Sequence, residues 1–317
     1  MDYQTCVLIN WPFLILNIVA NAFYIFCMLR PLHGERIKQP LKLLLGSLIC
    51  CTAAYQMSVM MLFFSNLTTN NGNLMRASYV MSVCTLTTSM TSSAWLNFFY
   101  YTQIVPAQRA LFIWIKKNIK PIIYCIWLIE RILNLSDFTV MFLNNSFVGF
   151  EFSNNFSTDH DQHLSTSDYL PWLAAMYTIQ VSIREAHFFF CLAVMGISSG
   201  STLVYLCRHM RRMVAIGQPF CCSRLSGQVR VTITGILQGV LYVVCAVWSV
   251  CIFLSQQMPS PFISPYISFT VINVYMTGTT FNLGAGQTVF RLRAADFWIR
   301  ATQWCKAPEV QQSERGG

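Results

Sequence analysis

The 317-residue sequence is poor in charge: only 10% of its residues are Asp, Glu, Lys or Arg, whereas 55% are apolar. A typical soluble domain has about 25% charged residues. A soluble protein of this length would need a more charged exterior to cover so much apolar surface. The composition therefore excludes an ordinary soluble domain and indicates an integral membrane protein.

The sequence also lacks the motifs of catalysis and of metal binding. It contains no GxSxG, HExxH or P-loop motif, and its 13 cysteines include no CxxC pair. Most cysteines lie within apolar runs, where they are small packing residues. We therefore expect no enzymatic activity, no metal and no cofactor. The net charge of +9 comes from short basic clusters between apolar runs, which favours membrane topology over nucleic-acid binding.

Seven apolar runs are long enough to cross a bilayer as helices, since a crossing needs about 20 residues. The sequence predicts an all-α membrane protein, with a seven-transmembrane-helix bundle in residues 1–290 and a cytoplasmic tail in residues 291–317. The expected spans are residues 7–29, 41–64, 78–104, 121–143, 186–207, 231–254 and 265–290.

The basic residues orient this bundle. Almost all of the 21 Lys and Arg residues lie in or beside segments 30–40, 105–120 and 208–230, or in the tail. By the positive-inside rule these segments are cytoplasmic, so the N-terminus lies outside the cell and the C-terminus inside. We expect a multi-pass protein of the plasma membrane. Sequons in the presumed outer loops are glycosylation candidates: Asn66, Asn144 and Asn155.

The tail is expected to form a short amphipathic helix after the seventh span. Apolar residues recur there at steps of three and four residues: Phe290, Ala294, Phe297, Trp298, Ala301, Trp304 and Cys305. The arginines of this segment, among them Arg293, are expected to point away from that face, toward anionic headgroups. Membrane lipids are thus expected partners of the chain.

The fourth span carries polar residues on one helix face, because Glu130, Asn134 and Asp137 follow at steps of four and three. Charged groups within a membrane are costly and often functional. The face forms either the polar wall of a ligand cavity, with Asp137 as the counter-ion of a cationic ligand, or a local network. In the second case Arg131 or a neighbouring helix neutralises the acids. The sequence leaves both interpretations open.

The outer halves of spans three and seven mix small polar and apolar residues at helical spacing, and Trp248 in span six is a further candidate. Such a mixture suits a cavity for apolar ligands, although ordinary packing of membrane helices uses the same residue types. The candidate ligand-binding residues are Ser82, Val83, Leu86, Thr87, Met90, Asp137, Trp248, Phe269 and Asn273.

Three segments carry a family resemblance. The sequences LNFFYYTQIV (residues 96–105) and FIWIKK (residues 112–117) resemble the end of span three and the following loop in the type 2 taste receptors. These are the bitter receptors among seven-helix G-protein-coupled receptors. LVYLCRHMRRM (residues 203–213) resembles the family motif that ends span five, and Asn21 matches an asparagine of span one. The family's arginine in span two is missing, so the chain resembles a divergent member.

The resemblance implies a small bitter-type organic ligand in the outer half of the bundle. It also implies activation of a heterotrimeric G protein with a gustducin-like alpha subunit, at the inner ends of spans three and five. On the matching motifs and basic inner segments, the residues assigned to coupling are Tyr100, Gln103, Arg109, Lys116, Arg208, His209 and Arg211.

Two alternatives stay open. A vomeronasal, pheromone-type receptor has the same layout, although such receptors generally keep a disulfide to the outer loop and segment 144–185 contains no cysteine. A small-solute transporter that uses the polar face of span four belongs to a different class. Transporters usually show internal repeats, and no repeat relates the two halves of this sequence.

Overall fold

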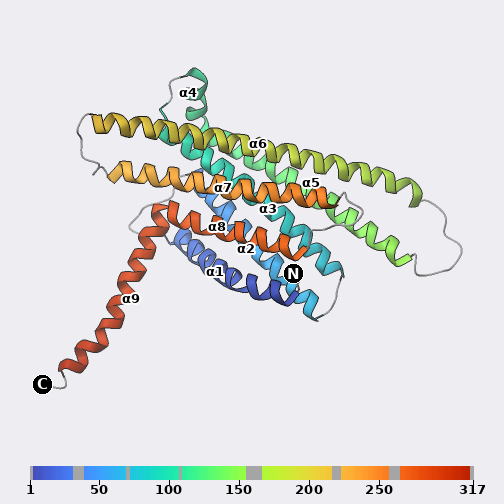
Figure 1. The fold of residues 1–317 in the computed structure, drawn as a ribbon, viewed down its shortest axis with the longest axis horizontal. Coiled ribbons are helices and arrows are strands. Elements are labelled where there is room, and N and C mark those ends of the chain that lie inside the picture. The colour runs from blue at the N-terminus through green and yellow to red at the C-terminus, as the bar shows by residue number, and fades with distance from the viewer. Residues whose placement is uncertain are drawn as a thin grey trace.

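The computed structural model describes residues 3–30, 39–68, 72–106, 109–154, 166–215, 223–256 and 265–314, and the regular structure within these ranges is helical. The helices are α1 (Tyr3–Leu29), α2 (Leu41–Thr68), α3 (Gly72–Ile104), α4 (Ala110–Lys117), α5 (Ile119–Asn154), α6 (Thr166–Ala215), α7 (Ser223–Gln256), α8 (Pro265–Gly286) and α9 (Thr288–Glu314). Seven long helices, from α1 to α3 and from α5 to α8, form the bundle, while α4 and α9 project from it (Figure 1).

Helix α3 occupies the middle of the bundle, because it packs against α2, α5, α6 and α7. Helix α1 packs against α2 and α8, and α7 packs against both α6 and α8. Figure 1 shows these helices running side by side, with α6 along one edge and α1 along the other. Wherever two helices of the bundle pack together, α3 or α8 is therefore one of the pair or a neighbour of it.

Hydropathy alone identifies only part of this bundle. Within the described residues, four helices are long and apolar enough to span a membrane: Gln4–Leu29, Leu41–Phe64, Ala175–Met213 and Gly227–Ile252. Helices α3, α5 and α8 have the required length, with 33, 36 and 22 residues, but none of them contains a stretch of this length that is apolar enough. In α3 most of the small polar residues are buried, and Thr88 and Ser93 donate hydrogen bonds to carbonyls one turn earlier. Neighbouring helices, rather than lipid, surround these side chains.

Helices α5 and α6 continue past the expected spans 121–143 and 186–207. Helix α6 has 50 residues and is therefore about 75 Å long. The expected outer loop 144–185 is helical at both of its ends. Polar residues end a hydrophobic run, but they do not end a helix, because the backbone hydrogen bonds do not depend on apolar side chains. Helix α6 continues even with Pro171 in its first turns. Asn66 and Asn144 lie within α2 and α5, Asn155 lies outside the described residues, and glycosylation stays a prediction.

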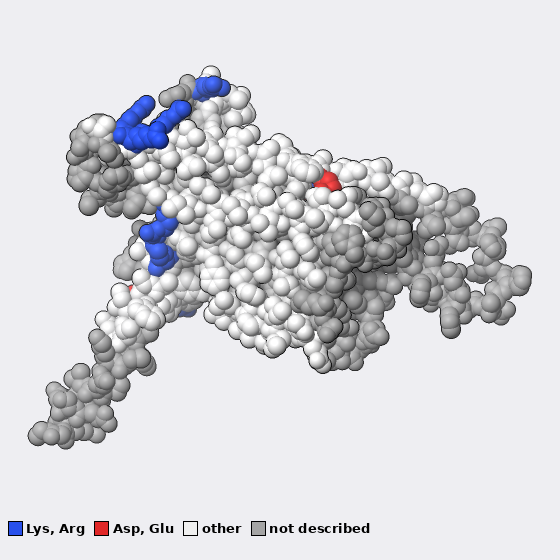
Figure 2. Space-filling view, viewed as in Figure 1, with Lys and Arg blue, Asp and Glu red and all other residues white. Residues whose placement is uncertain are grey.

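Charge is concentrated at one end of the molecule. Figure 2 shows Lys and Arg gathered where α4 projects and α9 begins, next to a flank that is almost free of charge on the visible face. We call this the basic end. Large apolar side chains are exposed along the bundle, for example Leu128, Ile132 and Leu135 on α5 and Val244 and Val247 on α7. So much exposed apolar surface is typical of contact with a membrane.

Helix α9 differs in one respect from the expected amphipathic helix. Phe290 is buried and stacks on Tyr24, with ring centroids 4.6 Å apart, and Phe297 lies 5.9 Å from the ring of Phe26. Arg293, expected on a separate face, also lies over Phe26, at 5.7 Å, and donates a hydrogen bond to the carbonyl of Arg30. The prediction for Arg293 was wrong, because residues four apart share a helix face and α1 offers both an aromatic ring and a carbonyl there.

Candidate functional site

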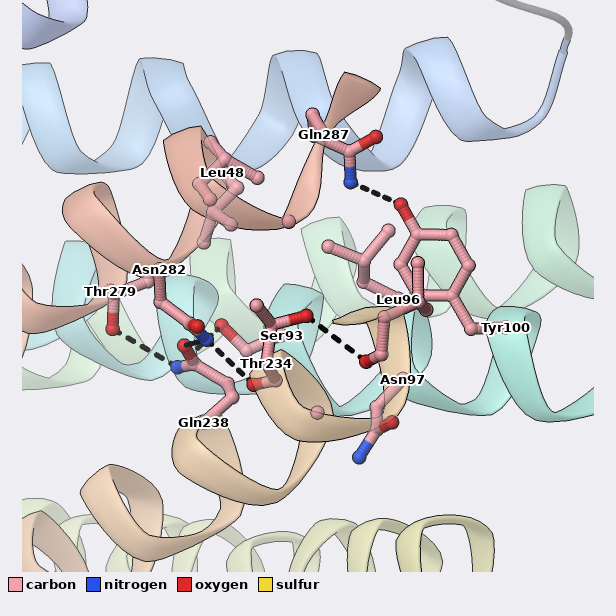
Figure 3. A pocket seen from close by; sticks show the side chains of 14 residues that line it. Leu48, Ser93, Leu96, Asn97, Tyr100, Thr234, Gln238, Thr279, Asn282 and Gln287 are labelled. Atoms are coloured by element: carbon pink, nitrogen blue, oxygen red, sulfur yellow. Dashed lines mark hydrogen bonds between the residues drawn. The ribbon is translucent and has the colours of Figure 1, made fainter. Parts of the chain in front are cut away.

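A small cavity lies near the basic end, between α2, α3, α7 and α8 (Figure 3). Its free volume is about 40 Å³, and a water molecule needs roughly 10–15 Å³ on this measure, so the cavity has room for a few waters. We call it the inner cavity. Its lining consists of Leu48, Ser93, Leu96, Asn97, Tyr100, Val231, Thr234, Gly235, Gln238, Thr279, Asn282, Leu283, Gly286 and Gln287.

Side-chain amides join three helices across the inner cavity. The Nε2 of Gln238 on α7 donates to the hydroxyls of Ser93 on α3 (3.3 Å) and Thr279 on α8 (3.0 Å). The Nδ2 of Asn282 donates in turn to the Oε1 of Gln238 (3.0 Å) and to the carbonyl of Thr234 (2.8 Å). Several dashed lines in Figure 3 follow this network. Sequence reasoning missed Gln238 and Asn282, although an amide within an apolar span is a recognisable signal.

The coupling candidates lie around the basic end. Tyr100 is half-buried at the inner cavity, where its hydroxyl accepts a hydrogen bond from Gln287. His209 is half-buried beside Tyr205, with ring centroids 6.0 Å apart, and Lys116 is half-buried on α4. The other candidates are exposed: Gln103, Arg109, Arg208 and Arg211. Helix α4 has no buried residue, and its Trp114 is 57% exposed, so the structure leaves this surface uncovered.

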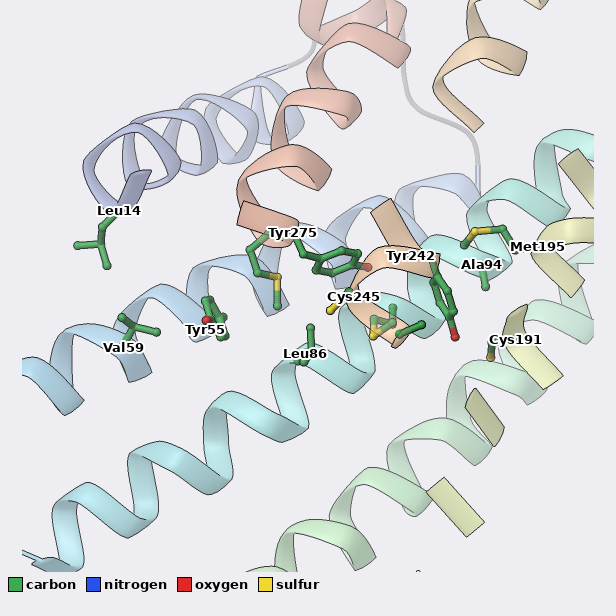
Figure 4. Close-up of a cluster of buried hydrophobic side chains, with 13 residues drawn as sticks. Leu14, Tyr55, Val59, Leu86, Ala94, Cys191, Met195, Tyr242, Cys245 and Tyr275 are labelled. Carbon is green, nitrogen blue, oxygen red and sulfur yellow. The ribbon is translucent and has the colours of Figure 1, made fainter. Parts of the chain in front are cut away.

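The α3 ligand candidates do not share one cavity. Leu86 and Met90 belong to the main apolar core, together with Tyr55, Tyr242 and Tyr275 from three other helices (Figure 4). Val83 and Ser82 lie farther along α3, nearer the end of the bundle that is opposite the basic end. Val83 packs beside Val80, Cys84, Phe138 and Tyr177, and the hydroxyl of Ser82 donates to the carbonyl of Tyr79 (2.7 Å).

The candidates on α7 and α8 lie in different seams of the bundle. Asn273 is buried between α8 and α1, where its Nδ2 donates to the Oδ1 of Asn10 (3.0 Å). Phe269 is half-buried one turn away on α8. Trp248 on α7 is half-buried, and its indole nitrogen has no hydrogen-bond partner among the described residues. The structure thus gives Asn273 a contact with α1.

A second cavity lies between α3, α5 and α6, farther from the basic end. Its free volume is about 20 Å³, enough for one water-sized group. It contains both acids of the polar α5 face, and we call it the acid cleft. Its lining consists of Thr87, Glu130, Leu133, Asn134, Asp137, Gln180, Ile183, Arg184 and His187. Of the predicted ligand-binding residues, Thr87 and Asp137 meet here.

Asp137 is neutralised by a neighbouring helix. The Nη1 of Arg184 on α6 lies 3.1 Å from Oδ1 and 3.2 Å from Oδ2 of Asp137. The Asp137 side chain is 5% exposed and that of Arg184 is 20% exposed, so the pair is mostly shielded from the surroundings. Of the two interpretations left open by the sequence, the local network is the one that the structure shows at this residue.

Glu130 lacks such a partner. Its side chain is 5% exposed, and its Oε2 lies 3.9 Å from the Nη2 of Arg131, near the limit for an ion pair. Its Oε1 is buried and accepts no hydrogen bond from the described residues. The guanidinium of Arg131 instead donates to the hydroxyl of Ser47 on α2 (3.2 Å) and lies 5.3 Å from the ring of Trp127. Glu130 is therefore the less compensated acid of the cleft.

Seven long helices with an exposed apolar flank and a basic end are typical of a seven-helix membrane protein. A family model described as "Taste receptor protein (TAS2R)" matches residues 4–297, and the chain belongs to this family of taste receptors. No curated protein sequence matches the chain. The family match confirms the resemblance seen in residues 96–105, 112–117 and 203–213, and it favours the taste receptors over the vomeronasal alternative. It is a family of receptors rather than enzymes.

Proposed function

We propose that the chain is a bitter-type chemosensory receptor of the plasma membrane, which binds small organic ligands and activates a heterotrimeric G protein with a gustducin-like alpha subunit. The observation that carries this proposal is the family match, which spans the bundle from α1 into α9. By the positive-inside rule the basic end faces the cytosol, and the acid cleft then lies toward the outer leaflet.

The proposed ligand site lies in the half of the bundle away from the basic end. The acid cleft and the seam beside Leu86 and Met90 are its parts. Ligand pockets usually enclose about 300–1,000 Å³, far more than either cavity of this structure. An agonist must therefore separate helices, and it signals only if it binds the separated state more tightly than the closed one.

The proposed coupling surface lies at the basic end, where the hydrogen bonds of Gln238 and Asn282 hold α3, α7 and α8 together. A helix of the G protein needs a groove into which its apolar face can pack. Loosening the inner cavity would open such a groove. Of the predicted coupling residues, Tyr100 lines the inner cavity. We propose that the others contact the G protein around this groove: Gln103, Arg109, Lys116, Arg208, His209 and Arg211.

The test is calcium release in cells that express the full chain with a promiscuous G protein and receive a panel of bitter compounds. We expect Arg208→Ala to lower the maximal response at unchanged surface abundance. Arg300→Ala is the matched control, because Arg300 is exposed on α9, where it pairs with Asp296 at 3.1 Å outside the proposed surface. Equal responses of the two variants would contradict the coupling surface, and a silent wild-type receptor at normal surface abundance would contradict the function.

The transporter alternative uses the polar face of span four. Asp137 on that face is paired with Arg184, and the match to a family of receptors favours the receptor over the transporter.

A further inference from the structure

We propose that Glu130 is the anionic anchor for a small lipophilic amine, whose protonated nitrogen occupies the acid cleft. The inference rests on the proposed receptor function in one respect: the amine is then a class of agonist. It replaces the sequence-based assignment of this role to Asp137, which lies two turns along the same face of α5.

A buried carboxylate that keeps an unused oxygen is costly, since a charge needs partners more than a neutral polar group does. Glu130 is 4% exposed, and its Oε1 has no hydrogen-bond partner among the described residues. Burying a charge without adequate hydrogen bonds or ion pairs is strongly unfavourable. A cation that donates a hydrogen bond to this oxygen would recover part of that cost, and this gain is the source of the proposed affinity.

The polar groups around Glu130 direct their hydrogen bonds elsewhere. The Nδ2 of Asn134 donates to the backbone carbonyl of Glu130 (2.9 Å), not to its carboxylate. The hydroxyl of Thr91 lies beside the Glu130 carboxyl group, but it donates to the carbonyl of Thr87 (3.0 Å) and leaves Oε1 without a partner among the described residues. Arg184 pairs with Asp137, and the Nε2 of His187 lies 3.7 Å from the sulfur of Cys191. The free oxygen of Glu130 therefore remains the principal unmatched acceptor of the cleft.

The shape of the cleft indicates which cation fits. Its free volume of about 20 Å³ takes one N–H group but no hydrated ion. Beside the polar Gln180, two apolar residues line the cleft where it meets the surface between α5 and α6: Leu133 is half-buried and Ile183 is 43% exposed. An amine with an apolar body fits both the acidic and the apolar side of the cleft, because the nitrogen reaches Glu130 while the apolar body covers Leu133 and Ile183.

The test measures binding to the purified full chain in lipid nanodiscs, with radiolabelled N,N-dimethylbenzylamine as the probe. Its carbon isostere, isobutylbenzene, has the same shape without charge and serves as competitor, and empty nanodiscs correct for partition into lipid. We expect saturable binding of the amine that isobutylbenzene does not displace. Glu130→Gln, which keeps the shape and removes the charge, should weaken binding about tenfold or more.

The matched control is Glu185→Gln, which removes one acid from α6 outside the cleft lining and should change the affinity by less than about twofold. Displacement by isobutylbenzene at comparable concentration overturns the proposal on the wild-type chain alone, even if the Glu130 variant fails to fold. Equal affinities of the two variants overturn it as well. Nanodisc binding needs no G protein, so its failure is distinct from a silent receptor in the calcium assay.

Discussion

Glu130 and Asp137 are both acids on one face of α5, but the bundle compensates them differently. Arg184 on α6 reaches both oxygens of Asp137, whereas Arg131 follows Glu130 directly and points about 100° around the helix, toward Ser47 on α2. Spacing in the sequence predicts that the acids share a face. It does not predict which acid meets a cation, because that depends on how α6 packs against α5.

The ion pair between Asp137 and Arg184 is expected to stabilise the bundle. Removing one partner leaves a mostly buried charge uncompensated, so Asp137→Ala and Arg184→Ala should each lower the apparent melting temperature, at a cost of up to about 3 kcal/mol. The double variant should lose clearly less than the sum of the two, because it leaves no lone charge. Thermal unfolding of the purified chain in nanodiscs measures all three. Additive losses would show that the two residues act independently.

At the scale of helices, the existence of each long helix could be predicted from the sequence but its ends could not. The bilayer forces an apolar run into a helix, since every backbone polar group must be paired there. No such rule stops a helix that has left the membrane, and α5 and α6 continue into the segment that was expected to be a loop. The short helix α4, within the basic segment 105–120, was not predicted because it has only 8 residues and buries none of them.

A glycine of α8 lies against a side chain of α1, which gives a prediction at this scale. A Cβ atom on Gly284 would collide with the hydroxyl of Tyr24, a buried side chain that donates to the carbonyl of Thr280 (3.0 Å). Gly284→Ala should therefore destabilise the bundle, by about 1–3 kcal/mol, as overpacking does.

The control for that prediction is Gly200→Ala on α6, where a Cβ would meet no atom within 4 Å. This change should be neutral or stabilising by up to about 1 kcal/mol, because alanine favours the helix more than glycine does. Thermal unfolding of both variants in nanodiscs gives the comparison. If Gly284→Ala is as stable as Gly200→Ala, the close packing of α1 on α8 is not as described.

At the scale of the whole molecule, the fold class was accessible from the sequence, while the ligand site was only partly so. Thr87 and Asp137 meet in the acid cleft, Leu86 and Met90 lie in the core, and Asn273 contacts α1. Helical spacing shows which residues share a face, but the rotation of each helix within the bundle is set by packing against several neighbours. The taste-receptor motifs were more informative near the basic end, where they identified Tyr100 at the inner cavity.

Both the proposed ligand site and the proposed coupling surface depend on how the bundle is oriented in the membrane. Helix α6 offers a direct test, because Trp172 near one end is 62% exposed and Arg211 near the other end is also exposed. Cells that express Trp172→Cys or Arg211→Cys are treated with a membrane-impermeant maleimide, and the labelling of the receptor is measured. The parent chain gives the background labelling from the cysteines it already has. The account predicts that Trp172→Cys is labelled on intact cells and Arg211→Cys only after permeabilisation. Labelling of Arg211→Cys on intact cells would contradict it.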